Sequence, residues 1–331
     1  MKRPLFTRSG GPAARGLRKL FAGLGLCAAL AVQAQGLTDR PVRVVVPFPA
    51  GTSTDLGARM LTQQLQVALS QTFLVDNKPG AVGSIGAMEV VRAAPDGHTL
   101  LFSSNSAAAS NVALLKTMPY DPAKDLTPIA GVGEGVLVLM VRTDHPAKNL
   151  DEFIAHVRQR PGKVSAGYGS ASSQIGIAML NKLARLDVLA VPYKGIPLAV
   201  TDTIGGAIDF TFVDMGNALA QAKGGKMRAL GVTSAKPSVL APEWPALGER
   251  LPGLDIRAWL AVFGPPNMPR EAVNRLSAAV ATAVAKPEMR EKLAATGMQP
   301  MALGPDELKA FVSSEIQKWK RLAQEANFTP E

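Results

Sequence analysis

The chain has 331 residues, a length typical of two domains, and 47% of them are hydrophobic while 19% are charged. This composition excludes a disordered tail protein, because it supplies enough apolar side chains to bury a core. The formal net charge is +10, but six basic residues and no acidic residue lie within the first 19 positions. The other basic residues are scattered and aromatic residues are few, which argues against nucleic acid as a partner.

The N-terminus has the three parts of a secretory signal. A basic stretch is followed by the apolar run Leu20–Val32 and then by small residues ending at Ala34. The run is shorter than the roughly 20 residues that span a membrane, and a buried N-terminal helix is the alternative. We therefore predict a signal peptide over 1–34 and a periplasmic protein that is not embedded in the membrane. The only cysteine, Cys27, would leave with the signal.

Strands and helices alternate in the first half of the remaining chain. Short β-branched runs predict strands, and apolar residues at helical spacing predict helices. In chain order we expect a strand at 42–46, a helix at 55–70, a strand at 73–75, a helix at 84–93 and a strand at 99–103. Loops of small residues separate these elements.

The second half repeats the alternation. An apolar run at 136–141 opens it, and a Pro-rich loop or linker is expected at 237–252. Strands are predicted at 164–168, 188–191, 208–213, 228–232 and 256–263, and helices at 150–160, 173–186, 270–285, 287–296 and 305–327. Such alternation is typical of α/β layers with largely parallel sheets.

The sequence contains little that supports catalysis or a cofactor. His98, His145 and His156 lack a second ligand at metal-binding spacing, and we expect them at the surface, so no metal and no cofactor are predicted. The stretch from Gly167 to Ala171 lacks the final Gly of a nucleophile elbow. An exported hydrolase using Ser172 or Ser173 remains a weaker alternative.

Loops rich in Gly, Ser and Thr follow the predicted strands, where helices begin. They span 48–55, 80–84, 103–106 and 169–173. Ligands of open α/β sheets bind beyond the carboxyl ends of the strands, and helix starts offer free N–H groups to anions. Because the loops contain almost no cations, the pattern favours a carboxylate held by neutral donors. Ordinary helix capping is the alternative for each loop taken alone.

The loops also carry a series of motifs in a characteristic order. The series begins with Val45-Val-Pro-Phe-Pro-Ala-Gly-Thr-Ser-Thr-Asp55 and Val75-Asp-Asn-Lys-Pro-Gly-Ala-Val-Gly-Ser-Ile-Gly86. It continues through Ala94–Leu100, Tyr168–Ser170, Pro192–Gly195, Gly205–Asp209, Gly225–Leu230 and Val262–Pro266. This series resembles the Bug family, the periplasmic receptors of tripartite tricarboxylate transporters. The resemblance covers nearly all of the chain after the signal.

The resemblance implies a type II periplasmic binding protein fold, in which two α/β lobes are joined by two crossing strands. We place the crossings near 127–137 and 255–264. Lobe 1 then comprises 35–132 and 258–331, and lobe 2 comprises 133–257. The resemblance also implies a monomer that captures a small organic acid, with mono- and dicarboxylates and aromatic acids included, and delivers it to membrane transporter subunits. A sensory receptor that signals to a membrane kinase is the alternative.

The family's contacts, carried onto this sequence, imply the site residues. From lobe 1 they are Phe48, Ala50, Thr52, Ser53, Thr54, Asp55, Val82, Gly83, Ser84, Ser103 and Asn105. From lobe 2 they are Ser170, Ala171, Ser172, Ser173, Tyr193 and Asp214. For Asp55 the alternative is to orient its loop rather than meet the ligand. The sequence departs from the family pattern at Val82, where a Gly is usual.

Overall fold

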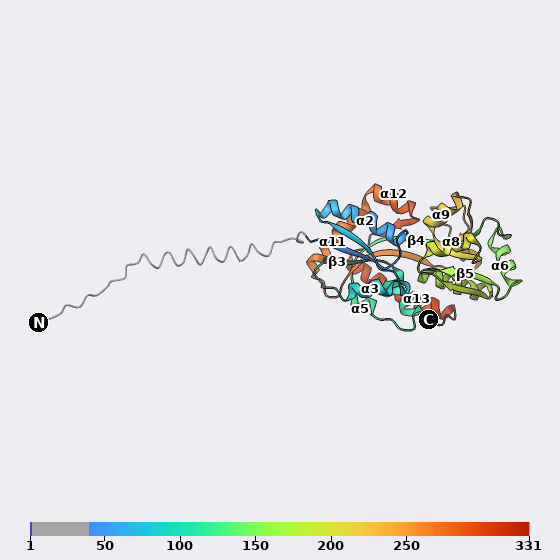
Figure 1. The fold of residues 1–331 in the computed structure, drawn as a ribbon, viewed down its shortest axis with the longest axis horizontal. Helices are drawn as coiled ribbons and strands as arrows, with labels where there is room; N and C mark the ends of the chain where they lie inside the picture. Colours follow the sequence, from blue (N-terminus) through green and yellow to red (C-terminus); the bar gives the residue numbers. More distant parts are fainter. Residues whose placement is uncertain (2–39, 331) are drawn as a thin grey trace. The chain divides into compact units, whose positions relative to one another are not determined.

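The computed structural model describes residue 1 and residues 40–330. From Pro41 onward the described chain forms one compact unit. The predicted signal peptide and its cleavage site fall outside the described residues, apart from Met1. Within the compact unit, helices flank a mixed sheet whose strands run in the order β2-β1-β3-β9-β4-β7-β5-β6, with β10 and β8 also paired to β4 (Figure 1).

The first half of the sheet is built on β1 (Val42–Val46), which pairs in parallel with β2 (Phe73–Asn77) and β3 (Thr99–Ser104). Val42, Val44 and Val46 pack into one hydrophobic cluster, while Val45 packs into another. Because successive side chains of a strand point to opposite faces, this run buries both faces of the sheet.

One strand, β4 (Thr127–Arg142), passes from the first half of the sheet to the second. Its residues 127–136 pair with β9 (Arg257–Gly264), and residues 133–135 also pair with β10 (Met298–Pro300). Its residues 137–142 pair with β7 (Phe210–Asp214) and β8 (Met227–Val232). The second half is completed by β5 (Val164–Tyr168) and β6 (Val188–Pro192), in parallel with each other.

Helices cover both faces of the first half. The apolar sides of α2 (Ser53–Leu69), α11 (Arg270–Ala285) and α12 (Pro287–Ala295) share a cluster with Val42, Val44 and Val46. On the opposite face, α3 (Ser84–Val91) and α13 (Pro305–Glu325) share the cluster that contains Val45.

The remaining helices belong mainly to the second half. They are α6 (Leu150–Arg158), α7 (Ala171–Ala184), α8 (Ile196–Gly205), α9 (Met215–Lys223) and α10 (Leu247–Arg250). Short turns complete the chain: η2 (Ala81–Gly83), the π-helical turn η3 (Ser106–Ser110), α4 (Asn111–Leu114) and α5 (Pro122–Asp125). No helix of the described residues is long and apolar enough to cross a membrane.

The order of elements agrees with the prediction, but the sheet is not largely parallel. Every ladder that involves β4 or β9 is antiparallel. The alternation of strand and helix did not reveal this, because β4 and β9 run in opposite directions without forming a hairpin. The loop predicted at 237–252 also contains the short helix α10, and β10 was not predicted. The lobe boundaries at 132/133 and 257/258 stay a prediction.

Thr233, directly after β8, joins the two segments that run between the halves of the sheet. Its Oγ1 accepts a hydrogen bond from the N–H of Leu137 on β4 (3.0 Å) and donates one to the carbonyl of Ile256, just before β9 (2.7 Å). Its backbone also bonds both residues. Thr233 is completely buried, so water cannot replace these bonds.

We predict that Thr233→Val lowers the free energy of unfolding by about 1–3 kcal/mol, because the isosteric side chain leaves a buried N–H and a buried carbonyl with one bond fewer. Urea unfolding of the purified protein measures this. Thr282→Val on the exposed side of α11, which removes one surface hydroxyl, is the control and should change the free energy by less than about 0.5 kcal/mol. Equal effects of the two variants would contradict the prediction.

Candidate ligand-binding site

A cavity lies beside the carboxyl ends of β1 and β3 in the first half of the sheet and of β5 and β7 in the second half. Its volume is about 50 Å³, and residues from both halves of the sheet line it. The lining residues are Phe48, Thr52, Ser53, Thr54, Ser104, Asn105, Leu137, Gly169, Ser170, Ser172, Ile196, Asp214, Ala258, Leu260 and Met298. This is the position at which open α/β sheets bind their ligands.

The start of α2 supplies the donors on one side of the cavity. Thr52 caps the helix: its Oγ1 accepts a hydrogen bond from the N–H of Asp55 (3.3 Å) and donates one to the carbonyl of Pro49 (2.9 Å). The N–H groups of Ser53 and Thr54, at the first two helical positions, have no acceptor within the helix. With the positive end of the helix dipole, these groups favour an anion.

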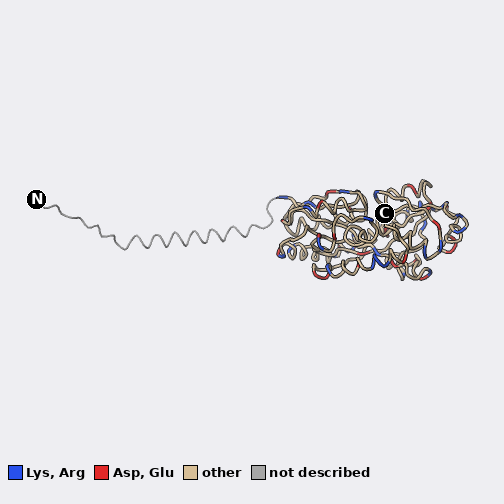
Figure 2. The backbone as a smooth tube through the Cα atoms, turned by 90° about the horizontal axis from the view of Figure 1, so that it is seen from below, with Lys and Arg blue, Asp and Glu red and all other residues tan. Residues whose placement is uncertain are grey.

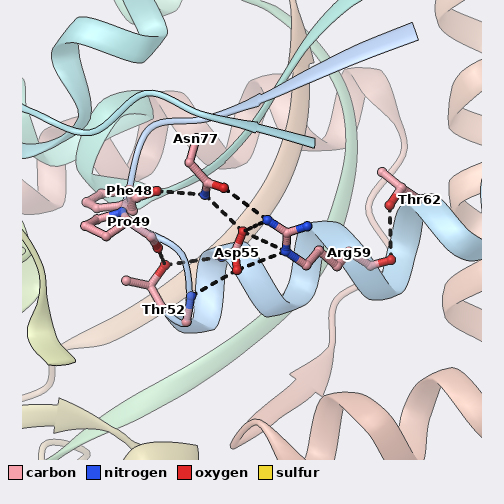
Figure 3. A network of polar contacts seen from close by, with 8 residues as sticks. Phe48, Pro49, Thr52, Asp55, Arg59, Thr62 and Asn77 are labelled. Atoms are coloured by element: carbon pink, nitrogen blue, oxygen red, sulfur yellow. Dashed lines mark hydrogen bonds and ion pairs between the residues drawn. The ribbon is translucent and has the colours of Figure 1, made fainter. Parts of the chain in front are cut away.

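Asp55 holds the loop before α2 in its conformation through a network of hydrogen bonds (Figure 3). Its carboxylate accepts hydrogen bonds from the N–H of Gly51 (3.0 Å), the amide of Asn77 (2.9 Å) and the guanidinium of Arg59 (3.1 Å). The Asn77 amide also donates to the carbonyl of Phe48 (2.9 Å). Burial acts to raise the pKa of Asp55, but the hydrogen bonds from Arg59, Gly51 and Asn77 outweigh it and hold the pKa below its ordinary value.

The start of α7 supplies the donors on the other side. Ser170 caps this helix by accepting from the N–H of Ser173 (3.2 Å), and the Ser173 hydroxyl in turn accepts from the N–H groups of Gly169 and Ser170. This reciprocal arrangement is a capping box. The Ser173 hydroxyl is therefore occupied by the hydrogen bonds of the capping box, whereas Ser170 and Ser172 line the cavity.

Several contacts join the two sides of the cavity. The Asn105 amide donates to the Ser172 hydroxyl (2.9 Å), and the N–H of Ala171 donates to the Ser106 hydroxyl (3.2 Å). Gly195 packs so closely on Pro49 that a Cβ placed there would lie 3.1 Å from the proline ring. Two hydrogen bonds and one close packing contact thus connect the two sides of the cavity.

Apolar residues form the rest of the cavity. Leu137 from β4, Ala258 and Leu260 from β9, and Met298 from β10 line it, together with Phe48 and Ile196. Most of them are more than nine-tenths buried. A molecule with a carboxylate at one end and a hydrocarbon part would match both kinds of surface.

Asp214 is the only charged residue among those that line the cavity. It ends β7 and caps α9, where its Oδ1 accepts from the N–H of Asn217 (3.0 Å) and its Oδ2 accepts from the Asn217 amide (2.8 Å). Burial raises the pKa of Asp214, although the hydrogen bonds from Asn217 act in the opposite direction.

The structure brings eight of the predicted site residues together at the cavity: Phe48, Thr52, Ser53, Thr54, Asn105, Ser170, Ser172 and Asp214. The other predicted residues do not line it. They are Ala50, Asp55, Val82, Gly83, Ser84, Ser103, Ala171, Ser173 and Tyr193. Val82 and Tyr193 instead line a second cavity of about 350 Å³, together with Lys194. Whether any of these residues binds a ligand stays a prediction.

The residues that do not line the cavity have other contacts. Ser84 accepts from the Asn111 amide (3.1 Å), and Tyr193 donates to Asp202 (2.7 Å). Gly83 packs beneath the ring of Phe48. These residues support the loops that the motifs identify, which is why a motif alone does not separate them from the residues facing the cavity.

Val82 has a left-handed backbone conformation, with φ 49° and ψ 38°, between Ala81 and Gly83, which also have positive φ values. This conformation is unfavourable for a β-branched residue. The carbonyl of Val82 accepts a hydrogen bond from the buried Asn111 amide (3.0 Å), which holds the turn in place. The family's usual Gly would adopt this backbone without strain.

Sequence reasoning missed seven lining residues: Ser104, Leu137, Gly169, Ile196, Ala258, Leu260 and Met298. Ser104 was one position from the predicted Ser103. Side chains alternate along a strand, so this one-residue shift reverses the face. Sequence reasoning also missed Arg59 and Asn77 as partners of Asp55. The spacing of four residues between Asp55 and Arg59 on a helix was an available signal.

The expectation that the histidines lie at the surface was wrong for two of them. His98 and His145 are buried, at 7% and 8% exposure. The turn and the proline beside them suggested exposure, but His145 packs on Phe153 and His156.

Basic and acidic residues are interspersed along the described chain (Figure 2).

A family model described as "tripartite tricarboxylate transporter family receptor" matches residues 57–328. The chain belongs to this receptor family. Three solved structures are similar to it over most of their length. The periplasmic binding protein BugD is 29% identical, with a TM-score of 0.84, and the match covers 89% of this chain and 100% of BugD.

The other two structures contain ligands. Rpa4515 of R. palustris with adipate is 28% identical, with a TM-score of 0.86 and coverage of 89% and 100%. MatC of Rhodopseudomonas palustris with bound malate is 31% identical, with a TM-score of 0.81 and coverage of 86% and 98%. These findings confirm the predicted family and the periplasmic binding protein fold.

We predict that Asp55→Asn destabilises the protein at neutral pH and reduces its sensitivity to acid. The lowered pKa means that Asp55 contributes stability above its unfolded pKa of about 3.9. This contribution is lost as the pH falls through the folded pKa, and the variant has no such contribution to lose. Urea unfolding at pH values from 6 down to 3 tests this.

Asp144→Asn, at an exposed position, is the control and should follow the wild type over the whole pH range. If the free energies of wild type and Asp55→Asn fall in parallel below pH 4, the carboxylate of Asp55 does not provide the predicted stabilisation.

Proposed function

We propose that this protein is a periplasmic receptor that captures a small organic acid between two lobes and delivers it to the membrane subunits of a tripartite transporter. The observation that carries the proposal is the kind of donor around the cavity. Two helix starts and several hydroxyl groups meet there, and no Lys, Arg or His is among the lining residues. Neutral donors of this kind bind a carboxylate without a permanent ion pair.

The apolar residues of the cavity support a ligand with a carbon skeleton. Phe48, Leu137 and Leu260 would pack on it, while the N–H groups of Ser53 and Thr54 and the Ser172 hydroxyl would donate to its carboxylate. The ligands of the two R. palustris relatives, adipate and malate, are organic acids. We therefore assign this chain to the same class of ligand.

Binding without turnover fits the site better than hydrolysis. Among the residues that line the cavity there is no histidine to act as a general base. The Ser172 hydroxyl accepts from Asn105, and the Ser173 hydroxyl is part of the capping box of α7. Within the part of the chain that the structure describes, neither serine hydroxyl has a hydrogen bond to the basic side chain that a nucleophile needs.

The cellular role is inferred from the family and from the predicted signal peptide over 1–34. The signal would direct the protein to the periplasm, where it would act as a monomer. Closure of the lobes on the ligand would present the membrane subunits with a shape that differs from the open form. The contacts between Asn105 and Ser172 and between Pro49 and Gly195 lie where the lobes would meet.

We expect organic acids to raise the midpoint of thermal unfolding. A ligand at 100 times its Kd adds about 2.7 kcal/mol of stability, enough for a shift of several degrees. The panel contains succinate, adipate, citrate and benzoate, with succinamide and benzamide as neutral counterparts, after refolding to remove carried-over ligand. A shift with the amides but with none of the acids would contradict carboxylate binding.

We also predict that Ser172→Ala weakens binding of the best acid about 5- to 10-fold, because one donor to the carboxylate is lost. Isothermal titration calorimetry measures the Kd. Ser313→Ala, at an exposed position on α13, is the control and should leave the Kd unchanged. An unchanged Kd in Ser172→Ala would remove this hydroxyl from the proposed site.

A further inference from the structure

The polar and the apolar groups of the cavity come from different parts of the fold. The hydroxyl and amide groups lie at the end of β3 or in the segments that follow β1, β3 and β5. Four apolar lining residues belong instead to β4 and to its neighbours β9 and β10. They are Leu137, Ala258, Leu260 and Met298, and we call them the apolar floor of the cavity.

The strand register joins the apolar floor into one surface. Gly135 of β4 pairs with Ala258 on one side and with Met298 on the other. Leu137 and Leu260 lie two positions further along their strands, so they point to the same face as Gly135 and Ala258. A Cβ placed on Gly135 would lie 2.9 Å from the Met298 sulfur, so the Met298 side chain covers this position. The surface is therefore apolar without interruption.

A second carboxylate on a ligand would find no partner at the apolar floor. Among the described residues that line the cavity there is no Lys, Arg or His, and the single charged residue, Asp214, is itself negative. Leu137, Leu260 and Met298 are each at most 3% exposed, so little water reaches this surface. A carboxylate buried there without a hydrogen-bond donor or a cation is strongly unfavourable.

The cavity is also small. Its volume of about 50 Å³ is well below the roughly 300–1,000 Å³ of pockets that hold drug-sized ligands. Its two sides already touch, through the hydrogen bond between Asn105 and Ser172 and through the packing of Gly195 on Pro49. The enclosed space therefore suits a short hydrocarbon chain.

We propose, resting on the proposed function, that the ligand is a short aliphatic monocarboxylate. Its carboxylate binds at the starts of α2 and α7, and its hydrocarbon chain packs on the apolar floor. Adipate and malate, the ligands of the two R. palustris relatives, each carry two carboxylates. This receptor would differ from those relatives because its apolar floor rejects the second carboxylate.

The first test uses pairs of acids in which a terminal methyl group is replaced by a carboxylate. The pairs are propanoate and malonate, butanoate and succinate, and pentanoate and glutarate. Titration calorimetry with the purified protein, refolded to remove carried-over ligand, gives each Kd. We expect the best monocarboxylate to bind at least about thirtyfold more tightly than its dicarboxylate partner, because the added charge is buried without compensation.

Chain length provides the second test. From acetate to butanoate, each added methylene should tighten binding about fourfold, since it is buried on the apolar floor. Hexanoate should bind more weakly than butanoate, because it exceeds the cavity. Met298→Ala enlarges the apolar end and should raise the affinity for hexanoate relative to butanoate at least about fivefold.

Met289→Ala is the matched control for this variant. Met289 is as buried as Met298 and belongs to the same hydrophobic cluster, but it does not line the cavity. It should keep the order of affinities of the wild type. A general loss of stability would weaken all acids alike, and the ratio of two Kd values does not respond to it.

Three results would overturn the inference. They are equal or tighter binding of the dicarboxylates, no gain in affinity from acetate to butanoate, and a chain-length preference that Met298→Ala leaves unchanged. If dicarboxylates, citrate or benzoate bind while the short monocarboxylates do not, the receptor for organic acids stands and the role of the apolar floor does not. If no acid binds, both fail.

Discussion

The arrangement of the site depends on one strand, β4, that belongs to both halves of the sheet. Its first ten residues pair with β9, and its last six pair with β7 and β8. Because β4 is continuous, the carboxyl ends of the parallel strands in the two halves come to face the same cavity. The buried hydroxyl of Thr233 bonds both connecting segments at the junction. A helix start from each half then lies beside the same small space.

Two carboxylates, those of Asp55 and Asp214, belong to the segments that surround the cavity, and they differ in whether they line it. Asp55 is buried, is not among the residues that line the cavity, and accepts hydrogen bonds from Arg59, Asn77 and Gly51. Its charge therefore shapes the loop without competing with a ligand anion. Asp214, by contrast, lines the cavity and pairs with no cation within the described residues.

The sequence was informative wherever local chemistry determines structure. The β-branched run 42–46 and the apolar spacing of 55–70 predicted β1 and α2 closely. The loops 48–55, 80–84, 103–106 and 169–173 were identified as the site, since small residues follow strands there, and all of them except 80–84 supply residues that line the cavity. Eight of the predicted residues line the cavity, and the alternative for Asp55, orientation of its loop, matches its contacts.

What the sequence did not reveal depends on pairing between distant segments. Leu137, Leu260 and Met298 line the cavity because β4, β9 and β10 are neighbours, and no motif records that pairing. The antiparallel ladders were missed for the same reason. Ser103 was predicted in place of Ser104 because a motif gives a position along the chain but not the face of the strand.

The central claim is that neutral donors at two helix starts hold the ligand carboxylate. A crystal structure with the acid that binds most tightly tests this directly. The account predicts that carboxylate oxygens lie within about 3.2 Å of the N–H groups of Ser53 or Thr54 and of the Ser172 hydroxyl. A carboxylate bound instead to a cation outside the cavity, such as Lys194 beside the second cavity, would contradict it.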